Sequence, residues 1–539
     1  MLGRFLCFLA LAGLPVAAWA QTSTPIDQNR VDRAAPAATL PSKERTAAPS
    51  AAVQVDAGSD TAPAIRNIRF EGTDVPLVVA KAAQPFVGQP ATKANLQALA
   101  DALSKAYGRS EVALFTIAIP EQNLSSGEVR VLVAEGHLEA VILVGEVEGR
   151  SLKLVRAYAD RLTRERPTSR RALERYLSLI QDIPGLKVKS SLQMGEGAGG
   201  VRLILDLDYQ RPTLTFSFDN RTTRMVKDGQ FHATARGYQL LREGDETQLN
   251  ATASVDFDDL LYVGLSHSTP VGSEGTRLSL NAGFLRTRPE GSDQSGEARS
   301  AGLTLSHPLI RSYRRNMTVS LALDGLNSEN AAFGSLISTE RSRAARAAIS
   351  YAQASERRTV SGALVASKGL DILHARVPDA IGEETFLKLN GRGAFDQAIG
   401  KRAAIRLRTS AQWTNDPLPA VERFSIGGPD FGRAFEVGLI TADRGVVGLA
   451  ELAWRPIRTG KFATSELYGF ADGAKARLLA RPGFGGRDFD LASAGAGVRL
   501  GWTDKAMIEV EYARVLDEPF PNYDGDWRLS VGWRLNIRP

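Results

Sequence analysis

The sequence has few residues of the kinds that hold metals or form covalent cross-links. Its 539 residues include one cysteine, Cys7, and five histidines. The histidines are scattered, with no pair four residues apart, so we expect no metal site. After residue 20 no stretch reaches the roughly 18 consecutive apolar residues that a membrane-spanning helix needs. Any passage through a membrane must therefore use β-strands.

Motifs for nucleotides and for catalysis are also lacking. The sequence has no P-loop lysine and no G-x-S-x-G nucleophile elbow. A G-x-G-x-x-G match at Gly195, Gly197 and Gly200 precedes the strand-like VRLILDLDY, whereas a dinucleotide site needs a helix there. The net charge of +6 comes from interspersed residues without a long basic run. We expect no enzyme, cofactor, nucleotide or nucleic acid.

Residues 1–20 have the pattern of a secretory signal peptide. One arginine precedes an apolar run that closes on Ala18-Trp19-Ala20, a small-x-small cleavage pattern. Cleavage there would remove Cys7, leaving a secreted chain without disulfides. Such a chain fits a bacterial envelope better than an animal extracellular space.

Three further regions follow. Residues 21–62 are rich in Ala, Pro, Ser and Thr, which predicts a disordered linker. A strand–helix–helix–strand–strand pattern then occurs twice and predicts two small α/β domains, 63–136 and 137–209. In the first, Leu96, Leu99 and Leu103 share one helical face behind Thr92, a candidate N-cap.

From about residue 210 the pattern alternates with a period of two. The last segment, WRLSVGWRL, places Trp527, Leu529 and Val531 on one face and charged or small residues on the other. A soluble β-sandwich would also alternate. The run of about 330 residues without a helix, and the charged face with Glu509 and Glu511, favour a barrel with a wet interior. We predict a sixteen-stranded antiparallel transmembrane β-barrel over residues 210–539, and we expect those glutamates to line its lumen.

The segment RFSIGGPDFGRAFEVG lies between two strand-like segments, which predicts a long barrel loop at about 414–443. Gly427, Gly428 and a third glycine at 432 allow sharp bends. Phe431 and Phe435 would be unfavourable in water. We therefore expect the loop to fold into the lumen, where Arg433 needs a carboxylate partner. The alternative is a solvated surface loop.

In this order, the regions resemble the two-partner-secretion transporters, the ShlB/FhaC/HecB branch of the Omp85 superfamily, across essentially all of the mature chain. IPEQNLSSGEVRVLVAEG (119–136) looks like the end of that family's first POTRA domain, and SRRALERYLSLIQDIPGLKV (169–188) looks like part of its second. FSIGGPDFGRAF (424–435) looks like the family's F-S-x-G-G-x-x-x-V-R-G-Y/F segment in loop six.

The resemblance implies particular residues and structures. It implies a plug helix in residues 21–62, and a lumen salt bridge between Arg433 and Asp472, which lies within ELYGFADGA. The sequence departs from the family pattern at two positions: Gly432 stands where valine is usual, and Ala434 where glycine is usual.

The resemblance also implies a function. The protein would be a translocase, a monomeric barrel among the lipids of the outer membrane of a Gram-negative bacterium, with its POTRA domains in the periplasm. These domains would recognise an unfolded, TpsA-like exoprotein, which the barrel would export. The alternative is an Omp85-type factor that assembles outer-membrane proteins.

Overall fold

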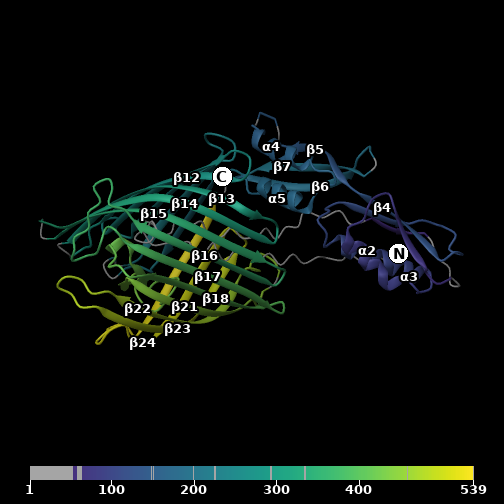
Figure 1. Ribbon diagram of the computed structural model, residues 1–539. Helices are drawn as coiled ribbons and strands as arrows, with labels where there is room; N and C mark the ends of the chain where they lie inside the picture. Colours follow the sequence, from purple (N-terminus) through teal and green to yellow (C-terminus); the bar gives the residue numbers. More distant parts are fainter. Residues whose placement is uncertain are drawn as a thin grey trace.

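The computed structural model of the protein describes residues 52–56 and 63–537, except residues 147, 150, 198, 224, 225, 227, 292, 293, 333, 334 and 458. The predicted signal peptide and plug helix lie outside these residues. Two α/β modules precede a closed barrel, and the second module lies between the first module and the barrel (Figure 1). No helix in the described residues is long and apolar enough to cross a membrane.

The first module packs helices against a four-stranded sheet of order β1-β3-β4-β2. Helix α3 begins after Thr92, whose hydroxyl accepts a hydrogen bond from the backbone N–H of Asn95. Leu96, Leu99 and Leu103 are fully buried, as their helical spacing predicts. The elements after β1 are β2 (Asn67–Glu71), α2 (Leu77–Ala83), η3 (Gln84–Phe86), α3 (Lys93–Tyr107), β3 (Phe115–Ile119) and β4 (Glu128–Glu135).

Strand β1 (Ala52–Val55) pairs in parallel with β3 at the edge of this sheet. The predicted disorder of residues 21–62 is therefore wrong for these four residues. The composition of residues 21–62 gives no signal for this strand, because the strand forms by hydrogen bonding to β3, which lies far along the chain. An edge strand can pair its free backbone groups with any extended segment that reaches it.

The second module repeats the β–α–α–β–β pattern, with a sheet of order β5-β7-β6. Helix α5 begins after Ser169, whose hydroxyl accepts a hydrogen bond from the N–H of Ala172. The repeated α/β pattern that the sequence predicts is thus present. The elements are β5 (His137–Gly145), α4 (Lys153–Leu162), α5 (Arg170–Gln181), β6 (Leu186–Met194) and β7 (Gly200–Tyr209).

The glycine-rich turn between β6 and β7 holds a carboxylate of the chain itself. The N–H groups of Glu196 and Gly197 donate hydrogen bonds to the Glu139 side chain at 3.0 and 2.8 Å. These bonds are the main reason that the pKa of the Glu139 carboxyl lies below its usual value. A Cβ at Gly200 would collide with that carboxylate. The glycines therefore serve a β-turn, as the strand that follows them predicts.

Hydrogen bonds lock the two modules together. The Arg170 guanidinium donates to the backbone carbonyls of Tyr107, Ser110 and Val112 at 3.1–3.2 Å. Thr168 is fully buried at the same joint, and its hydroxyl accepts the N–H of Leu138. These hydrogen bonds therefore join the two modules at one junction.

Sixteen antiparallel strands close into a barrel, in which the first strand, β8, pairs with the last, β25. This confirms the predicted sixteen-stranded antiparallel barrel. Its strands are β8 (Thr213–Asp219), β9 (Gln230–Tyr238), β10 (Glu246–Ser254), β11 (Leu260–Val271), β12 (Thr276–Thr287), β13 (Gln294–Arg311), β14 (Arg315–Ala332), β15 (Ser335–Ala354), β16 (Arg358–Gly369), β17 (Leu387–Ile399), β18 (Ala403–Thr414), β21 (Arg444–Trp454), β22 (Glu466–Leu478), β23 (Arg487–Trp502), β24 (Ala506–Asp517) and β25 (Trp527–Ile537).

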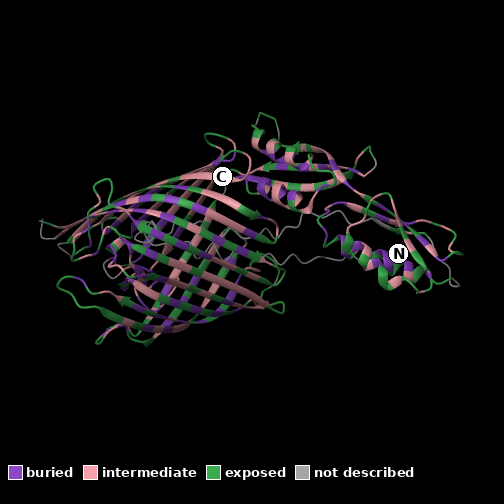
Figure 2. Cartoon of the chain, in the orientation of Figure 1, coloured by how far each residue is buried: buried purple, intermediate pink, exposed green. Residues whose placement is uncertain are grey.

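Burial alternates along the barrel strands (Figure 2). On β25 the outward-facing Trp527 and Leu529 are exposed. On β24 the inward-facing Glu509 and Glu511 are buried. The apolar face thus lies outside and the charged face inside, as in membrane barrels. The two glutamates face the lumen as predicted, but they are packed among other charged side chains rather than solvated.

The second module is docked on the barrel through the β9–β10 and β11–β12 turns and the end of β13. The Arg175 guanidinium donates to the carbonyls of Pro308 and Glu274 at 2.9 and 3.0 Å. Arg311 on β13 forms an ion pair with Asp182 at the end of α5. The barrel end that carries these turns therefore holds the second module in place.

One barrel carboxylate also completes a helix of the second module. Helix α4 begins after Leu152, which makes no side-chain cap. Glu243, in the β9–β10 turn, accepts the N–H groups of Leu154 and Val155 at 3.0 and 3.2 Å. A carboxylate at a helix N-terminus satisfies free donors and interacts favourably with the helix dipole.

Replacing Glu243 with alanine is expected to loosen α4, because loss of a cap costs about 1 kcal/mol. Hydrogen–deuterium exchange should show faster exchange at the amides of Leu154 and Val155. The amide of Ala172 serves as the internal control, because its cap, Ser169, belongs to the same module. Equal protection of α4 in the variant and the original protein would contradict this role.

Candidate functional site: the lumen loop

Residues 415–443 connect β18 to β21 and contain the glycine-rich segment. The loop carries a short 3-10 helix, η4 (Ala420–Glu422), and a small hairpin of β19 (Phe424–Ile426) and β20 (Ile440–Ala442). Gly427, Gly428 and Gly432 all have positive φ, at 106°, 113° and 69°. A Cβ at Gly427 would collide with the carbonyl oxygen of Glu436. These glycines therefore permit the sharp bends that their positions predict.

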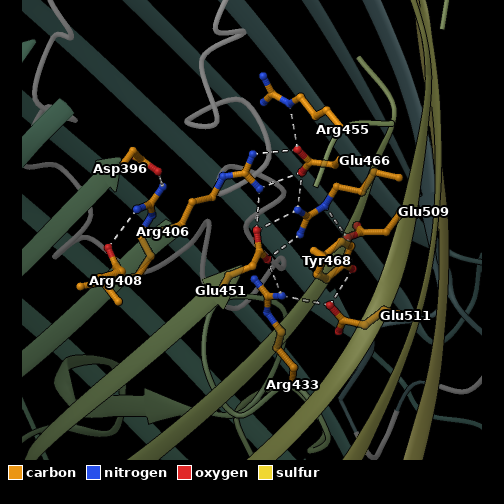
Figure 3. Close-up of polar contacts among 12 residues, drawn as sticks. Asp396, Arg406, Arg408, Arg433, Glu451, Arg455, Glu466, Tyr468, Glu509 and Glu511 are labelled. Carbon is orange, nitrogen blue, oxygen red and sulfur yellow. Dashed lines mark hydrogen bonds and ion pairs between the residues drawn. The ribbon is translucent and has the colours of Figure 1, made fainter. Parts of the chain in front are cut away.

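The loop tip reaches inward-facing carboxylates of the barrel wall. Nη1 of Arg433 donates to Glu451 on β21 at 3.1 Å and to Glu511 on β24 at 3.0 Å (Figure 3). Nε of Arg433 donates to the carbonyl of Pro429 at 3.1 Å, which braces the arginine within the loop. The guanidinium carbon lies 4.6 Å from the ring centre of Phe470, a cation–π distance.

Asp472 contacts Arg433 through the backbone rather than through the guanidinium. Its carboxylate accepts the N–H of Arg433 at 3.1 Å and the hydroxyl of Ser493 at 2.6 Å. The predicted Arg433–Asp472 salt bridge is thus corrected: the ion pairs go to Glu451 and Glu511. The backbone of Arg433 thus contacts β22, while its side chain reaches carboxylates on β21 and β24.

The two phenylalanines and Ala434 pack at the same tip. Phe435 is fully buried and its ring lies 5.6 Å from that of Tyr523. Phe431 is half-buried against the same apolar cluster. Ala434 is buried and does not have positive φ. Alanine therefore fits at this position, and the tip still reaches its partners.

The carboxylates that hold Arg433 belong to a larger set of ion pairs, which we call the tip cluster. Arg406 pairs with Glu451 and Glu466, and Arg499 pairs with Glu451, Glu466 and Glu509. The Tyr468 hydroxyl, which has one proton to donate, lies 2.6 Å from a Glu509 oxygen and 2.8 Å from a Glu511 oxygen. These side chains come from the five consecutive strands β18, β21, β22, β23 and β24, and Figure 3 shows most of them converging on one another. The cluster consists of Arg221, Arg406, Arg433, Glu451, Glu466, Tyr468, Arg499, Glu509 and Glu511.

The four glutamates of the tip cluster pair with its four arginines, and the more exposed Arg455 adds a further ion pair to Glu466 at 3.3 Å. Most of these side chains are nearly excluded from solvent; Glu511, for example, has no exposed surface. Buried ions must be paired, because an uncompensated buried charge is costly. Loss of Arg433 would remove one positive charge from this balance, so the cluster favours the loop in its inward position.

A second set of buried charges, which we call the base cluster, holds the start of the loop. Arg346 on β15 pairs with Asp324 on β14 and with Glu422 of η4, both at 2.7 Å. Lys388 on β17 adds an ion pair to Glu422 at 2.7 Å. Glu340 on β15 accepts the N–H of Ala420 at 3.1 Å. The loop is therefore attached to β15 and β17, across the barrel from part of the tip cluster.

The end of the loop is fixed as well. The Asp443 carboxylate accepts the N–H groups of Leu418 and Leu479 at 2.8 and 2.7 Å. It also forms an ion pair with Arg481 at 2.7 Å, and both side chains are almost fully buried. The loop is thus held at its tip, at its start and at its end.

The sequence pointed to only part of this site. Alternation placed Glu509 and Glu511 inside, and the glycine pattern singled out Arg433. Glu422, directly before the segment RFSIGG, gave no signal, since nothing in a single sequence relates it to Arg346. No group of three or more metal-ligating side chains occurs in the part of the chain that the structure describes.

Comparisons with known proteins agree with this architecture. Residues 199–500, more than half of the chain, match the family model "Haemolysin secretion/activation protein ShlB/FhaC/HecB". Residues 64–136 match "POTRA domain, ShlB-type", so the first module is a POTRA domain. The "Heme/hemopexin transporter protein HuxB" of Haemophilus influenzae is 22% identical over 467 residues, covering 81% of this chain and 80% of HuxB.

Two solved structures share the fold. CdiB from Escherichia coli matches with a TM-score of 0.72 at 18% identity, covering 97% of this chain and 98% of that chain. CdiB from Acinetobacter baumannii matches with a TM-score of 0.63 at 16% identity, covering 88% and 90%. Together with the family match, the barrel and the POTRA module assign the protein. The chain belongs to the ShlB/FhaC/HecB family, the outer-membrane β-barrel transporters of two-partner secretion in Gram-negative bacteria.

Proposed function

We propose that the protein exports one unfolded exoprotein, which its two α/β modules recognise in the periplasm and its barrel passes to the cell surface. The observation that carries this proposal is the loop inside the lumen, fixed by paired buried charges at both its tip and its base. A passive pore needs no such attachment. A transporter does need such an attachment, because its channel must hold the loop and later release it.

The second module offers a recognition surface beside the barrel. Strand β5 lies at the edge of its sheet, and a groove of about 380 Å³ lies between β5 and α4. The groove is lined by Val141, Leu143, Arg156, Ala159, Asp160 and Thr163. An extended or amphipathic segment with apolar residues at intervals fits such a groove. We propose that the second module also acts as a POTRA domain and guides the exoprotein toward the barrel.

The protein acts as a monomeric barrel in this proposal, with its apolar outer face against outer-membrane lipids. Since the sequence has no nucleotide motif, folding of the exoprotein outside the cell supplies the driving force. The loop stays latched in the resting protein and moves as the exoprotein passes.

Deleting the protein tests this function. We expect one large protein to disappear from the culture medium, while the other outer-membrane proteins stay at their original amounts. Expression of the intact chain should restore the missing protein. Loss of several unrelated outer-membrane proteins would instead support an assembly factor of the Omp85 type. An unchanged medium would contradict export.

A further inference from the structure

We propose that the outer face of β15 and β16 binds a phosphorylated, acylated glycolipid of the lipopolysaccharide type, with its phosphate against Arg341, Arg343 and Arg376. The site lies toward the barrel end opposite the second module (Figure 1). Arg311, the last residue of β13, contacts that module, so β15, which is two strands further on, begins at the opposite end. This inference rests on the orientation in the proposed function, in which that opposite end lies in the outer leaflet, where such lipids occur.

Arg341 and Arg343 belong to the outward-facing set of β15. On this strand Ala347 and Ile349 are exposed, whereas Arg346 is buried on the lumen side. Side chains alternate along a strand, and the pairing of β15 with β14 has no irregularity between Arg341 and Ile349. Arg341 and Arg343 therefore point away from the lumen, on the face that carries the apolar residues.

Three arginines gather on this face without a carboxylate partner. The N–H of Arg341 and that of Arg376 each donate to the other's carbonyl, at 2.7 and 2.9 Å, so their side chains lie directly opposite on one face. Arg343 is the next outward residue of β15, roughly 7 Å along the strand. In the described part of the chain none of the three forms an ion pair, although Glu329 and Asp371 are exposed nearby. Like charges directly opposite each other are destabilising, so an anion from outside the chain would offset their repulsion.

The side chain of Arg343 is already held in place on this face. Its guanidinium donates to the carbonyls of Leu326 and Leu373 at 3.2 and 3.3 Å. It also donates to the side-chain oxygen of Asn327 at 2.8 Å. Lys368 on β16 is exposed and lies diagonally across from Arg343, which adds a fourth cation. Guanidinium groups match the geometry of phosphate oxygens, so this arrangement suits a phosphate group.

An apolar groove of about 340 Å³ lies on the same outer face. Its lining includes Ala347 and Ala366, whose small side chains leave space, and the exposed Ile349, Leu364 and Leu389. Ala366 is two residues from the cation on β16, so the groove begins about 7 Å from the charged groups. A hydrocarbon chain can therefore lie in the groove while the phosphate of the same lipid contacts the arginines. A free phosphate ion would leave the groove empty.

Other outward cations near this end of the barrel are paired within the chain. Lys475 and Arg477 on β22 form ion pairs with Asp490 and Asp488 on β23, at 3.4 and 3.5 Å. All four side chains are exposed. These cations differ from the three arginines in having carboxylate partners, so they provide matched controls for a lipid site.

Thermal unfolding of the purified, full-length protein in lipid-free detergent tests the site. A ligand that binds the folded protein raises its unfolding midpoint. The probe is lipid A, the phosphorylated and acylated disaccharide of lipopolysaccharide. Arg341→Gln with Arg376→Gln should need about tenfold more lipid A, or more, for the same rise, because two charge-assisted contacts with phosphate are lost. Without lipid this variant should be at least as stable as the original protein, because the repulsion is removed.

Two further variants separate the charges from the groove. Lys475→Gln with Arg477→Gln should respond to lipid A as the original protein does. Ala366→Phe fills the groove and keeps every cation, so it should also need more lipid A for the same rise. With the original protein, lipid A from which the phosphates have been removed should act about tenfold more weakly.

Three results would overturn the inference. These are an equal response to lipid A in the original protein and the arginine variant, an equal loss in the Lys475 and Arg477 variant, and a rise with inorganic phosphate alone that matches the rise with lipid A. The assay uses purified protein and does not depend on export. Failure of the export function would appear separately, as an unchanged medium after deletion.

Discussion

Replacing Arg433 with alanine is expected to abolish most export while leaving the barrel assembled in the outer membrane. The change removes the ion pairs of the loop tip with Glu451 and Glu511. Breaking a buried pair costs about 3 kcal/mol or more, which shifts the ratio of latched to released loop by roughly a hundredfold. The measurement compares the exported protein in the medium with the amount of heat-stable barrel in the membrane.

Asp472→Asn is the matched comparison for this prediction. Asparagine keeps an oxygen that accepts the N–H of Arg433 but removes the charge of the residue that the sequence had suggested as its partner. Export should therefore fall much less than in Arg433→Ala. Glu511→Gln, which weakens the actual ion pair, should resemble Arg433→Ala. A larger loss of export in Asp472→Asn than in Glu511→Gln would instead show that the Arg433 guanidinium acts through Asp472.

Replacing Arg346 with methionine is expected to give the largest loss of stability. The change removes the cation that Asp324 and Glu422 share within the base cluster. Both carboxylates are nearly fully buried, so the free energy of unfolding should fall by about 3–5 kcal/mol. Unfolding of the purified barrel in urea, followed by circular dichroism, measures this difference. Protease should also cut the 415–443 loop more readily.

Arg408→Met is the control for the base cluster. Arg408 also faces the lumen and pairs with Asp396 at 2.8 Å, but about a quarter of each side chain is exposed (Figure 3). Such pairs contribute about 0–1 kcal/mol, so this variant should remain close to the original stability. Equal losses in Arg346→Met and Arg408→Met would contradict a special role for the base cluster.

The barrel could be predicted from the sequence because the alternation that marks each strand lies within a short segment of the chain. Alternation in WRLSVGWRL assigns each side chain of β25 to a face, and repetition of that pattern supplies the other strands. The helices of the first module were equally clear from Leu96, Leu99 and Leu103. Strand β1 was missed since its four residues are extended only because β3 offers them an edge. Such a pairing depends on the folded sheet and leaves no periodic signal.

The sequence predicted where the site lies in the chain, but it did not predict all of the contacts that the residues of the site make. The glycines with positive φ and the buried Phe435 follow from the residue types in RFSIGGPDFGRAFEVG. The partners of Arg433 depend on the register from β21 through β22 and β23 to β24, which determines which inward carboxylate lies beside the tip. A single sequence does not contain that register. Glu422 and Arg346 were missed for the same reason.

In the proposed function, a polypeptide passes through the lumen of this barrel. Site-specific photo-crosslinking from two adjacent residues of β12 tests it directly. Asn281 belongs to the inward-facing set of that strand, whereas Leu280 is exposed on the outer face. During export, a photo-crosslinker at Asn281 should capture the exported protein and one at Leu280 should not. Capture from Leu280 alone, or from neither position while export continues, would contradict passage through the lumen.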